Sequence, residues 1–106
     1  MSAKPVEALE VVQADFEYAR SFYESWKPGG GEKILQKYFE AVEWIEWNPG
    51  LFPRKFGIIQ RVILKRSYFV VYFFQEEKRS IVVAVLDGRR NPRVIRKLVA
   101  ARRKPV

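Results

Sequence analysis

YFVVYFFQ, residues 68–75, is the stretch that decides the fold, because it holds no charged side chain and no amide before Gln75. Valine, tyrosine and phenylalanine are enriched in β-strands. A strand with one face in water alternates apolar and polar residues, and that alternation is missing here. We therefore predict a central strand that is covered on both faces.

Two further strands are predicted beside it. IIQRVILK (58–65) and SIVVAVLD (80–87) are rich in β-branched residues, which is strand composition. EEKR (76–79) is short and charged, so it suits the loop of a hairpin between the second and third of these strands. The C-terminal half thus predicts three consecutive strands.

The N-terminal half has a different period. ALEVVQ (8–13) suits a short first strand, and Asp15 is placed to cap a helix that KPGGG (27–31) ends. A second helix is expected from Glu32 to about Trp47, before Asn48-Pro49-Gly50. The first helix has its apolar residues at helical spacing: Phe16, Ala19, Phe22, Tyr23 and Trp26. On the second helix the apolar stripe is Ile34, Leu35, Tyr38, Phe39, Val42 and Ile45.

A closing helix is predicted over 92–103. Asn91 suits its N-cap and Pro92 its first position. The apolar side of this helix holds Ile95, Leu98 and Val99, and the rest is basic, with Arg93, Arg96, Lys97 and Arg103.

The element order is therefore β-α-α-β-β-β-α, which predicts an α+β fold. Two N-terminal helices would pack on one face of a small, mainly antiparallel sheet. A chain of 106 residues suits a single domain over 1–106, with residues 1–6 and 104–106 expected to be flexible.

Composition excludes several kinds of site. The chain has no cysteine and no histidine, which removes disulfides, thiolate or imidazole metal sites, and cysteine or histidine catalysis. We expect no metal, no cofactor and no small-molecule substrate. The charges Glu7, Glu10 and Asp15 precede any long apolar run, so no signal peptide is expected. No stretch reaches the roughly 18 apolar residues of a membrane span, which predicts a cytoplasmic protein without membrane contact.

Charge divides the chain into two halves. Residues 1–53 carry 5 Lys and Arg against 9 Asp and Glu, a net charge of −4, whereas residues 54–106 carry 15 against 3, a net charge of +12. A half with so much positive charge attracts polyanions: nucleic acid, an acidic protein or an anionic membrane. A highly charged solvated surface is the plain alternative.

Two features of the second predicted helix have a plain and a functional interpretation. Trp44 and Trp47 suit base or cofactor stacking, but packing against the sheet is favoured, since aromatic residues dominate cores. Glu40, Glu43 and Glu46 suggest an acid/base or metal site, but they lack a second ligand cluster, so a solvated face is favoured.

Several segments in order resemble the RelE/ParE superfamily, the toxins of type II toxin–antitoxin modules. The resemblance spans roughly residues 8 to 93 and is closer to the ParE-like, plasmid-stabilisation branch. It rests on ARSFYESW (19–26), IEWNPGLFP (45–53), RVILKRSYFVVY (61–72) and VVAVLDGRRNP (82–92). Asp87 stands where the family often has histidine, and Ser67-Tyr68-Phe69 replaces its usual Phe-Pro-Tyr.

The resemblance implies candidate site residues. In the mRNA-cleaving branch, basic residues and a tyrosine or histidine surround the sheet; Phe69 occupies the place of one arginine. The matching catalytic candidates are Arg61, Lys65, Arg89, Arg90 and Tyr68. For nucleic-acid or target binding they are Arg61, Lys65, Arg66, Arg89, Arg90, Arg93 and Arg96.

We expect Arg61, Arg89 and Arg90 to gather on one rim of the sheet, where they would meet a phosphate backbone or an acidic partner. Bracing the turn through backbone carbonyls is the alternative role of Arg90.

Three functions follow as hypotheses. The first is a ParE-like toxin that blocks DNA gyrase without chemistry of its own. The second is a RelE-like, ribosome-dependent mRNA endonuclease, and the third is a non-toxic relative that binds RNA or protein. RNA cleavage needs groups that move protons, which are not evident here, so an enzyme is not favoured. Either toxin implies a cognate antitoxin as partner, with an amphipathic, partly acidic segment that folds onto the toxin.

Overall fold

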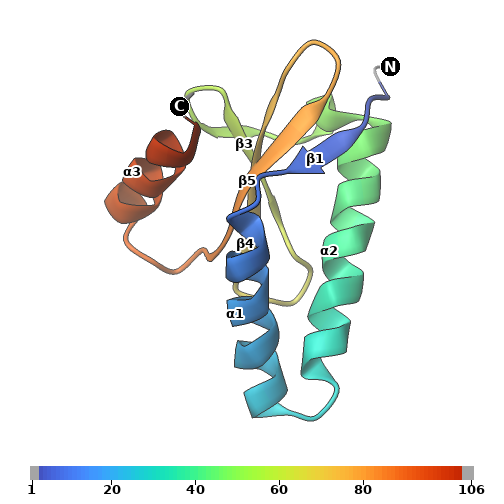
Figure 1. The fold of residues 1–106 in the computed structure, drawn as a ribbon, viewed down its shortest axis with the longest axis vertical. Coiled ribbons are helices and arrows are strands. Elements are labelled where there is room, and N and C mark those ends of the chain that lie inside the picture. Colours follow the sequence, from blue (N-terminus) through green and yellow to red (C-terminus); the bar gives the residue numbers. More distant parts are fainter. Residues whose placement is uncertain (1–2, 104–106) are drawn as a thin grey trace.

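A computed structural model describes residues 3–103 and shows an α+β fold with three α-helices and one five-stranded mixed sheet (Figure 1). The predicted fold class is confirmed. In chain order the elements are Val6–Ala8 (β1), Val12–Trp26 (α1), Gly30–Trp47 (α2), the 3-10 turn Pro49–Leu51 (η1), Arg54–Phe56 (β2), Ile59–Ile63 (β3), Phe69–Gln75 (β4), Ser80–Asp87 (β5) and Pro92–Arg103 (α3).

β4 lies at the centre of the sheet, as predicted. The strand order is β1-β5-β4-β3-β2, in which β1 pairs parallel with β5 and all other neighbours are antiparallel. Every residue from Phe69 to Phe73 is buried. Opposite Tyr72 and Phe73 the register shifts, so that Val83 and Ala84 pack on the same face of the sheet.

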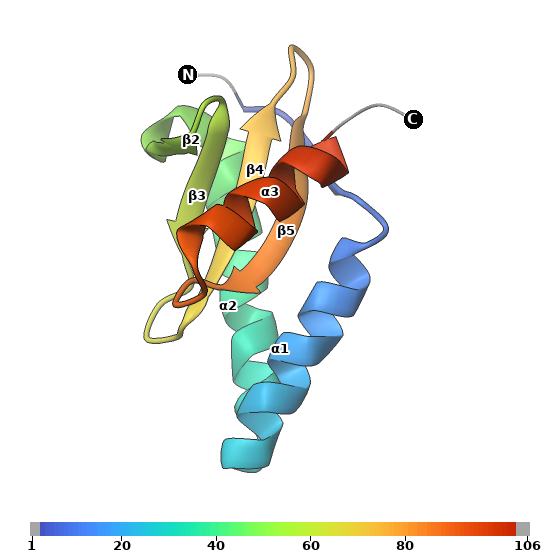
Figure 2. The same ribbon diagram turned by 90° about the vertical axis from the view of Figure 1, so that its left-hand side faces the viewer.

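Helices cover both faces of this strand. The α1–α2 hairpin packs on one face, where Phe69, Val71 and Phe73 of β4 join Ile34 and Ile45 of α2 in one core. On the other face, α3 forms a second, smaller core with Val70 and Tyr72 among others. Figure 2 shows α3 lying across the side of the sheet that faces away from the helix hairpin. The missing alternation in residues 68–75 is thereby explained.

α3 begins as its sequence predicts. The Asn91 side chain accepts the backbone N–H of Arg93 at 2.9 Å, and the Asn91 carbonyl accepts the N–H groups of Val94 and Ile95. Ile95 and Val99 are buried against the sheet, and Leu98 is partly buried beside them.

The first strand and the start of α1 differ from the prediction. β1 covers only Val6–Ala8, and α1 already begins at Val12. Val12 belongs to the helix because it lies seven residues, or two helical turns, before Ala19, and both are buried on the same side of α1. Asp15 does not cap the helix. Its carboxylate accepts the N–H of Val85 at 3.0 Å and forms an ion pair with Arg102.

α2 begins two residues earlier than predicted because the glycines are part of the hairpin. A Cβ at Gly30 would lie 2.3 Å from the Tyr23 carbonyl oxygen, so only glycine permits this approach of the two helices. The Glu24 carboxylate accepts the N–H groups of Gly29 and Gly31, which would otherwise lack partners at the helix start.

The segment after α2 holds an unpredicted turn and strand. η1 and β2 follow Asn48, and the buried Gln60 amide donates to the carbonyls of Pro49 and Phe52, at 2.8 Å each. β2 pairs with only the first two residues of β3, Ile59 and Gln60. The side-chain amide of Gln60 thus holds this segment through two tertiary hydrogen bonds. Local sequence patterns do not predict these hydrogen bonds.

The expectation that Trp44 and Trp47 pack against the sheet is wrong. Their exposed fractions are 55% and 48%, and their rings contact each other edge-on at 5.6 Å. The buried residues Ala41 and Ile45 hold the inner stripe of α2, so both indoles fall outside it. The solvated face was predicted correctly, since the α2 carboxylates are exposed: Glu40, Glu43 and Glu46.

The N-terminal segment is bonded from Lys4 onward. The Lys4 N–H donates to Glu46, and the Pro5 carbonyl accepts the Ser80 N–H. Flexibility of residues 1–2 and 104–106, which we also predicted, concerns positions outside the described residues.

Candidate target-binding site

Arg89 lies in the turn that follows β5 and is held there by Asp87. The guanidinium donates to both carboxylate oxygens of Asp87, at 3.1 and 2.7 Å, and the Arg89 N–H donates to the same side chain at 2.9 Å. Gly88 makes this turn tight, since its N–H donates to the Tyr68 carbonyl at 2.7 Å and an added Cβ would lie 2.7 Å from Val70. The turn therefore fixes where the Arg89 side chain points.

An aromatic ring also contacts the Arg89 side chain. The guanidinium carbon lies 3.7 Å from the centre of the Tyr68 ring, within cation–π distance. The Tyr68 N–H donates to the hydroxyl of Tyr23, a residue of α1, at 2.8 Å. Trp26 stands edge-on to Tyr68 at 6.2 Å. The strand ends and the end of α1 thus meet at one place.

We call this surface the aromatic tip and define it by Phe22, Tyr23, Trp26, Tyr68 and Arg89. Trp26 and Tyr68 are 64% and 40% exposed. Large aromatic side chains beside an arginine are the composition that dominates protein-binding surfaces. The geometry is suited to bind a partner without chemical change.

The ion pair between Asp87 and Arg89 stabilises the charged form of both side chains. The hydrogen bond from Arg89 is the main cause that lowers the pKa of Asp87, although burial opposes it. The same hydrogen bond raises the pKa of Arg89. Asp87 therefore stays ionised and serves to orient Arg89.

Arg61 lies on the other face of the sheet, which corrects the expected common rim. It pairs across β3–β4 with Tyr72, a member of the core beneath α3. Burial raises the pKa of Tyr72, and the nearby Arg61 charge acts in the opposite direction. Arg89 faces α1, because its guanidinium lies near Phe22 and Tyr68. Side chains alternate between the faces of a strand, so sequence distance alone did not reveal this separation.

The remaining predicted residues are spread around the molecule. Arg90 lines a cavity of about 160 Å³ between α1, β5 and α3, and its N–H donates to the Asp87 carbonyl. Lys65 and Arg66 are exposed in the β3–β4 turn, where Arg66 has φ of 56°. Arg93 and Arg96 are exposed on α3. Of the catalytic candidates, only Arg89 and Tyr68 are in direct contact.

Sequence reasoning missed the contribution of α1 to the aromatic tip. Phe22, Tyr23 and Trp26 were assigned to the inner stripe of the first helix, yet Trp26 is the most exposed of the three. Its position directly before the KPGGG segment indicates only that it lies at the helix end. Whether an aromatic residue there is buried depends on how far the sheet reaches.

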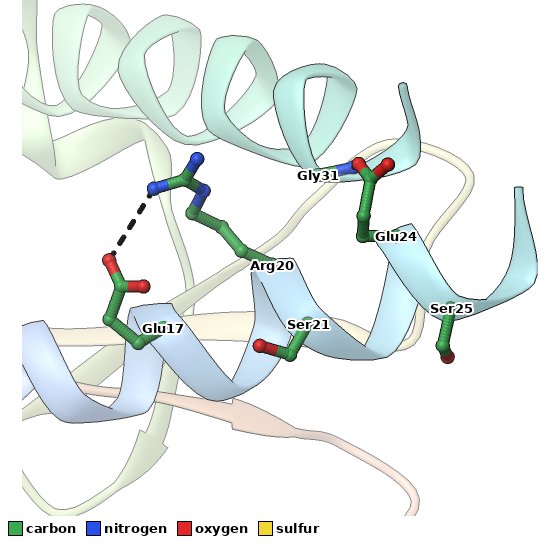
Figure 3. Close-up of a pocket in the computed structure, with 6 residues that line it drawn as sticks. All are labelled: Glu17, Arg20, Ser21, Glu24, Ser25 and Gly31. Carbon is green, nitrogen blue, oxygen red and sulfur yellow. Dashed lines mark hydrogen bonds and ion pairs between the residues drawn. The ribbon is translucent and has the colours of Figure 1, made fainter. Parts of the chain in front are cut away.

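A larger cavity than the one beside Arg90 lies on the helix hairpin. It has a volume of about 480 Å³ and is lined by Glu17, Arg20, Ser21, Glu24, Ser25 and Gly31. Figure 3 shows Arg20 turned toward Glu17, with which it forms an ion pair at 3.5 Å. Glu24 accepts the N–H groups of Gly29 and Gly31, so the carboxylates of both Glu17 and Glu24 already have partners.

Residues 3–103 contain no group of three or more Asp or Glu side chains placed to hold a metal ion. Within the same range no helix is long and apolar enough to cross a membrane.

Comparisons with known proteins agree with this architecture. Residues 6–92 match the family model described as the ParE toxin of the type II toxin–antitoxin system parDE. Among solved structures, the chain is similar to one described as a chromosomal ParDE TA system from P. aeruginosa, with a TM-score of 0.70 and 16% identity over 80% of this chain and 96% of that chain. At this identity the likeness shows the fold. No curated protein matches the chain.

Proposed function

Because the chain belongs to the ParE toxin family of type II toxin–antitoxin systems, we propose that it inhibits DNA gyrase by binding and that a cognate antitoxin neutralises it. Family membership identifies the class of protein, and the target is the further step. Gyrase acts in the cytoplasm, so the proposal places the protein there.

One observation carries this proposal: Arg89 is held in a fixed orientation between Asp87 and the Tyr68 ring while its side chain remains 54% exposed. A guanidinium held by its own protein loses little side-chain entropy when a partner binds. The exposed Trp26 beside it supplies apolar area. The aromatic tip is therefore preorganised for a protein partner.

The arrangement favours binding over RNA cleavage. Attack by a 2′-OH group needs a proton acceptor, a proton donor and cations around one phosphate. The pKa of Asp87 is lowered, so it is a poor proton donor, and Tyr72 is buried beneath α3. Arg61 and Arg89 lie on different faces of the sheet. These facts support inhibition without chemistry.

A supercoiling assay with purified gyrase tests the proposal. The wild-type protein should inhibit supercoiling, and Arg89→Ala or Tyr68→Ala should raise the inhibitory concentration by about tenfold or more, as expected for anchor residues of an interface. Lys78→Ala is the matched control, because Lys78 is exposed in the β4–β5 hairpin at the opposite end of β5 and should leave inhibition unchanged.

Undiminished supercoiling at saturating wild-type protein would contradict the gyrase proposal. Primer extension on translated mRNA then distinguishes the alternative, since codon-associated cuts would identify a RelE-like nuclease. Normal growth of a bacterial host on induced expression would instead favour the non-toxic RNA- or protein-binding relative.

A further inference from the structure

We propose that the outer face of α3 binds the phosphate backbone of duplex DNA. Only the source of that DNA, the duplex on which gyrase acts, rests on the proposed function. α3 lies on the side of the sheet that faces away from the helix hairpin (Figure 2). It therefore supplies a contact with nucleic acid that is separate from the aromatic tip, which includes the end of α1.

The exposed side of α3 is basic along its length. A helix with 3.6 residues per turn places positions 93, 96, 97 and 103 within an arc of about 120°. The buried Ile95 and Val99 lie on the opposite side, against the sheet. We call this surface the basic face and define it by its exposed cations, Arg93, Arg96, Lys97 and Arg103.

The basic face has no counterion among the described residues 3–103. α3 itself contains no aspartate or glutamate. The ion pairs within this range are formed by other arginines: Arg20, Arg79, Arg89 and Arg102. Asp15 reaches α3, but it is held by Arg102 on the inner side of the helix. The charges of the basic face therefore act on ions and molecules outside the chain.

Helix stability does not explain this arrangement of charge. The partial positive charge at the start of a helix favours acidic side chains in the first turn, yet Arg93 is the charged residue there. Arg93 also precedes Arg96 and Lys97 by three and four residues, the spacings at which like charges on a helix repel. A bound polyanion relieves this repulsion, so its binding stabilises the helix.

The length of the basic face matches the spacing of phosphates in DNA. From Arg93 to Arg103 the helix rises by about 15 Å, at about 1.5 Å per residue. One strand of B-DNA carries a phosphate about every 3.4 Å along the axis, so this length spans about four phosphates. Four cations therefore face about four phosphates of one strand. A single phosphate group engages only part of such a surface.

The other side chains of α3 favour a duplex over a single strand. Proteins that bind single-stranded nucleic acid stack its bases on aromatic side chains, and α3 contains no aromatic residue. The Phe74 ring beside the helix is partly buried and already faces the Arg103 guanidinium at 5.9 Å. α3 also lacks asparagine and glutamine, which read adenine. Contacts with phosphates are therefore the main interaction available to the basic face.

Fluorescence anisotropy of a labelled DNA duplex measures this binding with the purified full chain and without gyrase. The wild-type protein should bind the duplex at low salt. Each neutralised phosphate contributes about −0.9 to the slope of the logarithm of the association constant against the logarithm of salt concentration, so four contacts predict a slope of about −3.6.

Replacing Arg93 and Arg96 together by alanine should weaken binding about tenfold or more at about 0.1 M salt and reduce the slope to about −1.8. The matched control is the double variant Lys27→Ala and Lys33→Ala, which has the same net charge but loses its exposed cations from the α1–α2 hairpin. This control should retain the wild-type slope. A urea midpoint of the Arg93 and Arg96 variant no lower than that of wild type shows that it is folded.

Three results would overturn the proposal. They are no binding of the duplex by about 0.1 mM wild-type protein at about 0.05 M salt, equal weakening in the two double variants, and tighter binding of single-stranded RNA of the same length. The last result would identify the basic face as an RNA-binding surface.

Supercoiling assays separate this inference from the proposed function. DNA binding by a wild-type protein that leaves gyrase active would support the basic face and refute gyrase inhibition. Inhibition of gyrase by a wild-type protein that does not bind the duplex would refute the basic face and leave the proposed function intact. If both proposals hold, the Arg93 and Arg96 variant should inhibit supercoiling less than the Lys27 and Lys33 variant.

Discussion

Two aspartates each hold an arginine, in surroundings that differ in solvent exposure. The side chains of Asp15 and Arg102 are 8% and 14% exposed, and this pair joins α1 to α3. Asp15 also accepts the Val85 N–H, so α1, α3 and β5 meet at one carboxylate. In contrast, Arg89 is 54% exposed beside Asp87 and is free to contact a partner. Burial thus separates a stabilising pair from a binding pair.

Arg102→Ala is expected to lower the free energy of unfolding by about 3 kcal/mol, because it leaves the Asp15 carboxylate buried without its counterion. Urea unfolding followed by circular dichroism measures the loss. Arg79→Ala, which removes an exposed pair with Glu7 and Glu76, is the control and should shift the urea midpoint much less. Equal shifts for the two variants would show that burial does not set the strength of the Asp15 pair.

The stability contributed by Asp87 depends on pH in a direction set by its lowered pKa. An unfolded aspartate titrates near about 3.9, so the gain is complete above that pH and is lost as pH falls through the lower folded value. The gap in the free energy of unfolding between wild type and Asp87→Asn should be constant from about pH 6 to 8 and shrink below about pH 4. A gap that widens on acidification would mean that the Arg89 interaction is not the main cause.

Among the elements, α3 shows most directly how the apolar side of an amphipathic helix packs on the sheet. Ile95 is 2% exposed in the core beneath the helix, and its neighbour Val94 is 54% exposed. Like Val94, the basic residues Arg93, Arg96 and Lys97 are exposed. Apolar packing together with the Asp15–Arg102 pair therefore holds this helix on the sheet.

Ile95→Ala should destabilise the protein by about 2–4 kcal/mol through lost burial and a residual cavity. Val94→Ala, one residue earlier in the same helix, should change stability by less than about 0.5 kcal/mol. Chemical denaturation with a common slope compares them. Similar losses at both positions would show that α3 packs in a different orientation.

At the scale of the whole molecule, the −4 half forms the helix hairpin and the +12 half forms most of the sheet and α3. Positive charges concentrated in one half repel one another in the folded state and attract anionic partners. Salt screens both effects, because the Debye length falls to about 3 Å at 1 M.

Raising sodium chloride from about 0.05 to 0.5 M should therefore raise the thermal midpoint of the free protein. Thermal unfolding at both concentrations checks the sign. A midpoint that falls or stays constant would show that repulsion within the +12 half does not limit stability.

Local pattern determined most of the fold. A run of residues without alternation must be covered on both sides, so YFVVYFFQ alone placed β4 at the centre. The cap at Asn91 and the stripe of Ile95 and Val99 predicted α3, since capping and helical spacing depend on residues a few positions apart. The absence of histidine and cysteine limited the possible chemistry without any coordinates.

Only the tertiary structure decided which functional side chains meet. Arg89 contacts Tyr68 and lies near Phe22, whereas Arg61 lies with Tyr72 on the other face, because strand register and the turn after β5 determine direction. Exposure of Trp26 and Trp44 likewise depends on where the sheet ends beneath each helix. Such contacts join residues far apart in the chain, and no local propensity encodes them.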